Sequence, residues 1–335
     1  MTTLHSFDGE DGAGPGAPMI QATDGSFYGI TMNGGSNNSG TVFKITPSGA
    51  LTTLHSFGSG DGSSLNGPLV QGNDGNFYST TESGGTSGYG TIFKITSNGV
   101  YTIVHNFDST DGSAPACGLV QASDGYFYGT TYEGGPNNSC ENGCGTVFKM
   151  TPGGTLTTLH SFDSTDGANP IAAMIQATDG NFYGTTYAGG TGGDWGTVFK
   201  ITRDGKVTTL HSFDGDDGAQ PYGPVAQATS GNLYGTATNG IGAANDGTVF
   251  SISTELGPFV SFVSNSGKAG QVIGILGQGF TGTSGVSFNK TPAEFAIKSN
   301  TLLTATVPAG ASTGLVTVAT PAGTLTSNIP FRILP

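Results

Sequence analysis

Short hydrophobic runs alternate with Gly-rich polar loops along residues 1–257, and the same order of runs returns five times. The segment TTLHSF at 2–7 returns at 52–57, as TIVHNF at 102–107, and as TTLHSF at 157–162 and 208–213. Each copy continues with a loop containing DG, a run such as PMIQATDGSFYGIT, a Gly-rich loop and GTVFKIT. These runs are short and bounded by turn residues, so each repeat is predicted to hold four β-strands.

Two kinds of connection separate the predicted strands. TDGS, NDGN, SDGY, TDGN and TSGN suit tight hairpin turns, and TPSG, TSNG, TPGG and TRDG suit a second set. The loops after FYGT and after LHSF are longer and vary between copies. Because successive strands of a meander run antiparallel, both long loops must lie at one end of each sheet, here called the loop end.

A four-stranded meander that returns about every 50 residues is typical of a β-propeller blade. The fifth copy has no outer strand after TVFSI at 248–252, whereas one stands at 2–7. We therefore predict an all-β fold: a five-bladed β-propeller of four-stranded blades over residues 1–257, closed by the N-terminal strand. The repeats are placed at about 2–50, 51–100, 101–155, 156–206 and 207–257.

The repeat pattern stops near residue 257. Residues 258–335 show short alternating strands every eight to twelve residues, which predicts a small immunoglobulin-like β-sandwich. Its charge also differs, because four of the chain's ten basic residues but only one acidic residue, Glu294, lie there.

Composition and charge narrow the possible partners. The 335 residues include 59 Gly and carry a formal net charge of −13, so phosphate-rich nucleic acids and anionic membranes would be repelled. No apolar run is long enough to span a membrane. The first ten residues do not form a signal peptide, and we expect a processed chain whose export signal has been removed.

The LHSF, DG, LVQATDGNFYGTT, GG and GTVFKIT elements resemble a bacterial tandem repeat known as GloVer, and all five copies fit, over about residues 2–254. The fifth departs most, with Ser230 in place of the turn Asp. Residues 258–335 resemble an IPT/TIG domain through GQVIGILGQGF, VSFNKTPAEF and LTATVPAGASTGLVTV. The resemblance implies a large secreted or surface-anchored bacterial protein, in an extracellular or cell-surface location. It implies no catalytic motif.

All five histidines occupy one position of the repeat, and we expect each to bond a neighbouring loop or a Tyr28-type residue rather than to catalyse or bind metal. They are His5, His55, His105, His160 and His211. The DG loops after them carry spaced carboxylates, which suit either Asx-turns or, as a weaker alternative, calcium. The calcium candidates are Asp108, Asp111, Asp163, Asp166, Asp214 and Asp217. No other cofactor is expected.

The three cysteines allow a small disulfide. Cys140 and Cys144 are close enough in sequence to pair across a Gly/Asn loop, while Cys117 stays a free thiol or takes one of them as its partner.

The varying loops carry aromatic residues next to amides and carboxylates, a combination that suits stacking on a sugar ring. Simple packing of the loops is the alternative for each ring. Trp195 is our first candidate, and the full set is Trp195, Tyr89, Tyr132, Tyr187, Tyr222, Asp194 and Asn137. For catalysis we consider Glu82 and Glu133, which we place at matching positions of repeats two and three, together with Asp194.

These features favour a secreted or cell-surface binding and adhesion module that recognises a neutral glycan or another surface ligand at the loop end. A carbohydrate-active enzyme, either a glycoside hydrolase or a polysaccharide lyase using loop-end carboxylates, is the alternative. A third hypothesis is a structural repeat that self-associates into an extracellular assembly.

Overall fold

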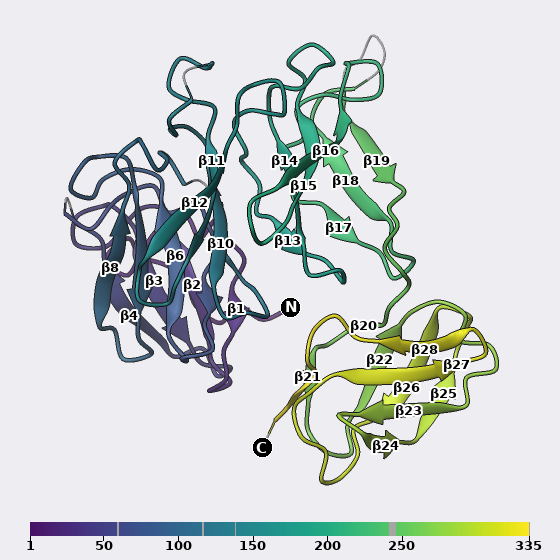
Figure 1. The fold of residues 1–335 in the computed structure, drawn as a ribbon. Coiled ribbons are helices and arrows are strands. Elements are labelled where there is room, and N and C mark those ends of the chain that lie inside the picture. The colour runs from purple at the N-terminus through teal and green to yellow at the C-terminus, as the bar shows by residue number, and fades with distance from the viewer. Residues whose placement is uncertain (59, 116, 138, 241–245, 335) are drawn as a thin grey trace. The chain divides into compact units, whose positions relative to one another are not determined.

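The computed structural model describes residues 1–335 except 59, 116, 138, 241–245 and 335 (Figure 1). The described residues form strands, turns and loops. Among them there is no helix long and apolar enough to cross a membrane. The chain divides into two compact units, unit one being Met1–Gln176, Gly180–Val225 and Gly235–Phe250, and unit two Ala177–Asp179, Ala226–Tyr234 and Ser251–Pro335.

Four four-stranded antiparallel sheets have their strands in chain order, as the sequence predicted. Each sheet joins three strands of one sequence repeat to the outer strand that opens the next one, and from here on a numbered repeat means such a sheet with its loops. Repeat one contains β1 (Ile20–Gln21), β2 (Phe27–Thr31), β3 (Thr41–Ile45) and β4 (Leu51–Ser56). Repeat two contains β5 (Val70–Gln71), β6 (Phe77–Thr81), β7 (Thr91–Ile95) and β8 (Tyr101–Asn106). Repeat three contains β9 (Val120–Gln121), β10 (Phe127–Thr131), β11 (Thr146–Met150) and β12 (Leu156–Ser161). Repeat four contains β13 (Ile175–Gln176), β14 (Phe182–Thr186), β15 (Thr197–Ile201) and β16 (Val207–Ser212).

Turn chemistry explains the tight end of each sheet. In repeat one, Gly25 has a φ of +81°, and Asp24 Oδ1 accepts a hydrogen bond from the Ser26 N–H at 3.0 Å. The other oxygen, Oδ2, accepts from Tyr28 Oη and Lys44 Nζ, both at 2.8 Å. The turn aspartate therefore holds the turn itself and two of the strands beside it.

Neighbouring repeats are joined by aromatic stacking and by a glutamine. The rings of Tyr28 and Phe77 stack with centroids 4.0 Å apart. The Thr23 N–H of repeat one donates to Gln71 Oε1 of repeat two at 3.0 Å. The same bond recurs from Asn73 to Gln121 and from Ser123 to Gln176, so the repeated glutamines fix one repeat against the next.

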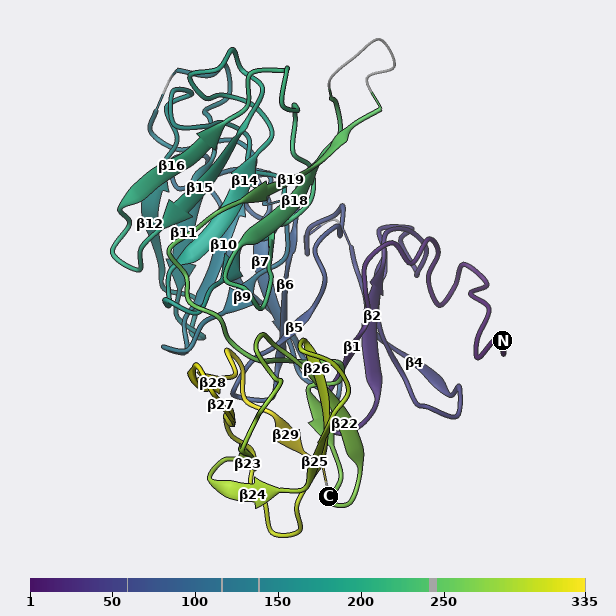
Figure 2. The same cartoon turned by 90° about the vertical axis from the view of Figure 1, so that its right-hand side faces the viewer.

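The fifth repeat has three strands, β17 (Ala226–Gln227), β18 (Leu233–Ala237) and β19 (Thr248–Ile252). The predicted closing strand is not formed: residues 2–7 have no strand pairing, and the segment next to the N-terminus is drawn without a strand (Figure 2). Residues 2–7 pack on repeat one instead: the Phe7 ring meets Phe43 edge-on at 5.2 Å. The closed five-bladed propeller therefore remains a proposal.

Unit two contains the sandwich, whose two four-stranded sheets follow the orders β20-β22-β26-β25 and β24-β23-β27-β28 beside a parallel pair, β21-β29. Its strands are β20 (Ser261–Phe262), β21 (Ser266–Gly267), β22 (Val272–Leu276), β23 (Gly285–Phe288), β24 (Thr291–Ala293), β25 (Phe295–Ile297), β26 (Leu302–Thr306), β27 (Val316–Thr320), β28 (Gly323–Thr326) and β29 (Arg332–Ile333). Ile275, Phe280 and Leu303 are fully buried in its core. The hairpin of repeat five belongs to this unit, because Gln278 Nε2 donates to Thr229 Oγ1 at 3.1 Å.

Candidate functional site

The two long loops of each repeat are held together at the loop end by backbone bridges. The bridged residues are Ala13 and Asn33, Ser63 and Ser83, Ser113 and Glu133, Ala168 and Ala188, and Ala219 and Asn239. The variable residues of both loops are therefore presented on a repeated frame.

Three of the tyrosines expected to bind ligand gather at this end, each from a different repeat. The rings of Tyr187 and Tyr222 meet edge-on with centroids 6.3 Å apart, and Tyr222 is 56% exposed. Burial raises the pKa of Tyr132, and nearby Glu133, Tyr187, Tyr222 and Glu82 raise it further. We call these five residues the tyrosine cluster.

The two glutamates of the tyrosine cluster are not at matching positions, contrary to our expectation. The bridge partner of Ser113 is Glu133, whereas that of Ser63 is Ser83, so Glu82 precedes the bridged position by one residue. Glu82 is instead equivalent to Tyr132, because each follows the last threonine of its strand. Both glutamates nevertheless lie close enough to Tyr132 to affect its pKa.

Asn66 is a residue that the sequence analysis missed. Its Nδ2 donates to Glu82 Oε2 at 2.6 Å and so orients that carboxylate. Asn66 and Tyr222 occupy the same position in their crossover loops. Each lies five residues before the glutamine that recurs in every repeat, Gln71 or Gln227. Aligning the crossover loops with one another would have pointed to this position.

Trp195 and Tyr89 occupy equivalent positions, but among the described residues their contacts are with loops rather than with the tyrosine cluster. The backbone oxygen of Trp195 accepts from the Gln220 N–H at 2.7 Å, and that of Tyr89 accepts from Ala114 at 3.0 Å. A Cβ placed on Gly215 would lie 3.4 Å from Trp195 Nε1, so the indole packs beside that glycine. About 40% of Trp195 stays exposed.

Asp194 and Asn137 have local roles in their loops. Asp194 has a φ of +71°, and its Oδ1 accepts from the Gly189 N–H at 2.6 Å. Asn38 makes the equivalent bond to Gly34 in repeat one, so Asp194 shapes its loop. Asn137 accepts from Ser139 Oγ at 3.0 Å.

The cysteine loop is closed by a disulfide between Cys140 and Cys144, whose Cα atoms are 5.1 Å apart. Cys117 is a buried free thiol that contacts Thr130 Oγ1 at 2.7 Å. Burial raises the pKa of the Cys117 thiol.

Four of the five DG loops form Asx-turns, and the fifth has Gly58 in place of the first aspartate. Asp108 Oδ1 accepts backbone N–H groups from Thr110 and Asp111, and the same pattern recurs at Asp163 and Asp214. The remaining calcium candidates, Asp111, Asp166 and Asp217, each pair with a histidine. Within the described ranges no three His, Cys, Asp or Glu side chains converge as metal ligands.

Every histidine pairs through Nε2 with the last aspartate of the loop that follows it, at 2.6 to 3.0 Å. The partner is thus the neighbouring loop. It is not the Tyr28-type residue, because Tyr28 donates to Asp24 instead. The pairs of His55, His105, His160 and His211 tie an outer strand to the start of the crossover loop that follows it, as Asp61 does for His55.

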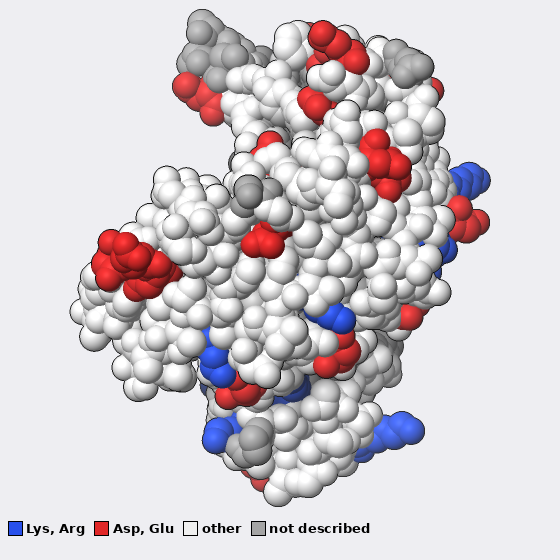
Figure 3. Space-filling model, turned by 90° about the vertical axis from the view of Figure 1, so that its left-hand side faces the viewer, with Lys and Arg blue, Asp and Glu red and all other residues white. Residues whose placement is uncertain are grey.

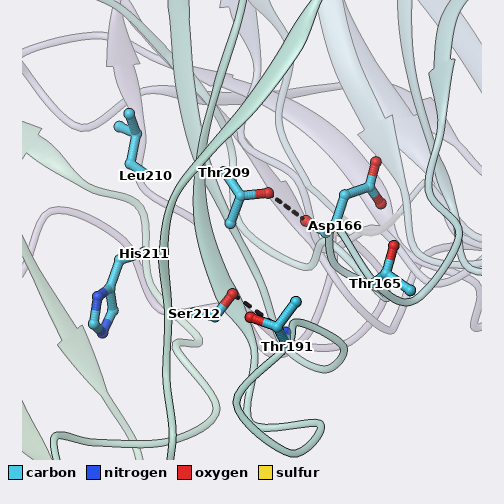
Figure 4. Close-up of a pocket in the computed structure, with 7 residues that line it drawn as sticks. All are labelled: Thr165, Asp166, Thr191, Thr209, Leu210, His211 and Ser212. Carbon is cyan, nitrogen blue, oxygen red and sulfur yellow. Dashed lines mark hydrogen bonds between the residues drawn. The ribbon is translucent and has the colours of Figure 1, made fainter.

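A shallow cavity of about 450 Å³ lies along β16, lined by Thr165, Asp166, Thr191, Thr209, Leu210, His211 and Ser212 (Figure 4). Its polar groups largely bond one another, since Thr209 Oγ1 donates to the Asp166 backbone oxygen and the Thr191 N–H donates to Ser212 Oγ. On the face shown in Figure 3, acidic side chains form separate patches on an otherwise mostly uncharged surface.

Comparison with known proteins identifies the two parts of the chain. The Gloeobacter/Verrucomicrobia repeat family matches residues 1–141 and 138–277, and the IPT/TIG domain matches residues 258–333. A search of curated proteins finds no match.

Three solved structures illustrate distant similarities. A gluconolactonase from Xanthomonas campestris is 14% identical with a TM-score of 0.46, covering 89% of this chain and 88% of that one. A luciferin-regenerating enzyme is 13% identical with a TM-score of 0.43, covering 72% and 78%. A fungal alcohol oxidase in complex with copper is 16% identical with a TM-score of 0.40, covering 95% and 75%. Similarities at this level carry no argument about activity.

The repeat matches together cover most of the sequence, and they agree with the repeated four-stranded sheets and with the sandwich that follows them. The chain belongs to the Gloeobacter/Verrucomicrobia repeat family and carries an IPT/TIG domain.

Proposed function

We propose that this protein is a secreted or cell-surface binding module that holds a glycan, or another surface ligand, at the tyrosine cluster. The observation that carries this proposal is the convergence of Tyr132, Tyr187 and Tyr222 from three repeats beside two carboxylates. An aromatic face stacks on the C–H face of a sugar, while amide and carboxylate groups bond its hydroxyls. The Cys140–Cys144 disulfide suits an oxidising extracellular location.

The experiment is calorimetric titration with neutral oligosaccharides. Tyr222→Ala is expected to weaken binding by about 1–3 kcal/mol, because it removes an exposed ring of the cluster. Tyr89→Ala is the matched control, since Tyr89 is also exposed but contacts the crossover loop at Ala114 instead of the tyrosine cluster.

Trp195→Ala separates this site from the one that the sequence analysis placed first. If Trp195→Ala loses affinity and Tyr222→Ala does not, the ligand binds at the loop of repeat four instead. If no glycan binds the parent protein, the proposed function is wrong.

The second candidate function is a glycoside hydrolase or a polysaccharide lyase. It is favoured by one observation, the proximity of both Glu82 and Glu133 to Tyr132, because glycosidases act through two carboxyl groups. Release of reducing ends from a bound glycan, abolished by Glu82→Gln or Glu133→Gln, would support it. Binding without product release would favour the binding module.

We also propose that residues 2–7 supply the fourth strand of repeat five and so close a five-bladed propeller. In repeats one to four a TVFKI-type strand pairs with an LHS-type strand in the same register, with a shift after its second residue. Residues 2–7 carry the same sequence as the outer strands, and β19 carries the TVF sequence of their partners. The third hypothesis, self-association, would place the same strand on a second copy.

A further inference from the structure

We propose that the glycan recognised by the tyrosine cluster carries protonated amino groups, as a hexosamine chain that is not fully acetylated does. This inference rests on the proposed function and deepens it by naming the class of sugar. It follows from the distribution of charge between the two ends of the repeats.

The basic residues of the repeats all belong to the tight-turn end. Lys44 pairs with Asp24 at 2.8 Å, and Arg203 lies 3.8 Å from Asp124. The other four stand either at the equivalent strand position of Lys44 or in the turn that contains Arg203, and they are Lys94, Lys149, Lys200 and Lys206.

The loop end, in contrast, has carboxylates without Lys or Arg in its loops. Each long loop runs from the end of one strand to the start of the next, and the sequence places neither residue type there in residues 8–19, 32–40, 57–69, 82–90, 107–119, 132–145, 162–174, 187–196, 213–225 and 238–247. Within the part of the chain that the structure describes, the last aspartate of each DG loop pairs with the repeated histidine before it and not with a Lys or Arg.

Glu82, Tyr132 and Tyr187 each directly follow the last threonine of the second strand of their repeat, so they form one row across neighbouring repeats, and Glu133 comes directly after Tyr132. A ligand stacked on the tyrosines would therefore also cover the two glutamates. Taking a carboxylate out of water is costly unless another charge or strong hydrogen bonds replace the water. Asn66 satisfies one oxygen of Glu82, as described above. A protonated amine would compensate the negative charge of the Glu82 and Glu133 carboxylates, whereas a ligand with hydroxyl groups alone supplies no opposite charge.

Tyrosine faces favour the same ligand. An ammonium group within about 6 Å of an aromatic centroid is attracted by the negative face of the ring. Two rings set edge-on, as Tyr187 and Tyr222 are, present faces in two directions. An amino sugar therefore uses both interactions at once, stacking through its C–H groups and pairing through its amine.

The test compares two oligosaccharides of equal length, a glucosamine oligomer and an N-acetylglucosamine oligomer, by calorimetry at about pH 6, where amines are protonated and carboxylates ionised. The glucosamine oligomer is expected to bind at least about tenfold tighter in low salt. This preference should shrink as ionic strength rises. Glu82→Gln and Glu133→Gln should remove the preference, because they should weaken binding of the glucosamine oligomer much more than binding of the acetylated oligomer.

Tyr222→Ala is expected to weaken binding of both oligomers, and Tyr89→Ala neither. Equal affinity of the parent protein for the two oligomers would overturn this inference and leave the proposed function standing. Absence of binding to either oligomer and to neutral glycans would overturn both. Spermine binding as tightly as the glucosamine oligomer would also overturn it, because charge alone would then suffice without a sugar.

Discussion

At the scale of single residues, the same histidine–aspartate pair stands in different surroundings. His55 stacks face to face on Tyr101 with ring centroids 4.1 Å apart, and Tyr101 Oη donates to the Asp61 backbone oxygen. The side chain of His211 is 38% exposed, compared with 21% for His55. Histidines at equivalent positions of the repeats are thus buried to different extents. His211 is more exposed because repeat five has no outer strand in this structure.

The carboxylates of the turns and crossover loops predict that the fold loses stability in acid. Hydrogen bonds to these carboxylates outweigh burial where burial opposes them, and hold the pKa values below the ordinary 3.8 at Asp11, Asp24, Asp74, Asp108 and Asp163. Groups of this kind stabilise the fold above their unfolded pKa and lose that contribution as pH falls through the folded one. The melting temperature should therefore change little from these groups between about pH 7 and 5, and fall below about pH 4.

Asp74→Asn is the variant that checks this cause. Asp74 accepts hydrogen bonds from Tyr78 Oη and from Asn76, and the amide cannot reproduce both its charge and its acceptors. The variant should be less stable at neutral pH and should show a smaller loss of melting temperature on acidification. An equal loss in both proteins would exclude Asp74 as a contributor.

At the scale of elements, the repeated glutamine predicts how strongly neighbouring repeats are joined. Gln121 accepts from the Asn73 N–H of the preceding repeat at 2.9 Å and donates to Gly125 in its own hairpin at 3.0 Å. Gln21 has the hairpin bond, to Gly25 at 3.3 Å, and no described bond to another repeat. Gln121→Ala should therefore lower the free energy of unfolding by about 1 kcal/mol more than Gln21→Ala.

Urea denaturation followed by circular dichroism measures both variants. Equal losses would show either that the bond between repeats contributes nothing or that Gln21 also has such a partner. The size of the loss separates these cases: a small, equal loss in both variants means that the bond between repeats contributes nothing, whereas an equal loss of about 1 kcal/mol or more means that Gln21 also has a partner in another repeat.

The sequence predicted the repeated elements well because each strand and tight turn is set by local residues. Turn aspartates and glycines fix the hairpins, and alternation of apolar runs fixes the strands. The prediction that Glu82 and Glu133 occupy matching positions was wrong, because the glutamate of TTYEGG stands one position later than the glutamate of TTESGG. Convergence of Tyr132 with Tyr222 depends on contacts between repeats, which no local pattern records.

At the scale of the whole molecule, the first and last repeats expose apolar residues that are buried in the others. Met19 is 54% exposed, whereas its equivalents Leu69 and Met174 are 3% and 4% exposed. Val249 in β19 is 79% exposed, whereas its equivalent Val42 is fully buried. Apolar surface left at both ends of a repeat array favours covering one with the other, in one chain or between copies.

Deleting residues 1–8 would not test closure by itself. Those residues also pack on repeat one, where Phe7 contacts Phe43 and the Leu4 backbone oxygen lies beside Gly49, so their loss destabilises an open array too. A covalent link between residues 2–7 and β19 is specific to the pairing. The register of Thr41 with Ser56 places Ser6 opposite Thr248 in the closed form.

Ser6→Cys combined with Thr248→Cys should therefore form a disulfide under oxidising conditions, because directly opposed residues of antiparallel strands bring Cβ atoms within disulfide reach. A monomeric product on a non-reducing gel, with a raised melting temperature, is the outcome expected of a closed five-bladed ring. Disulfide-linked dimers and longer chains would show that the strand is exchanged between copies, as self-association requires. If both cysteines stay reduced while the Cys140–Cys144 bond forms normally, residues 2–7 do not pair with β19 and the array is open.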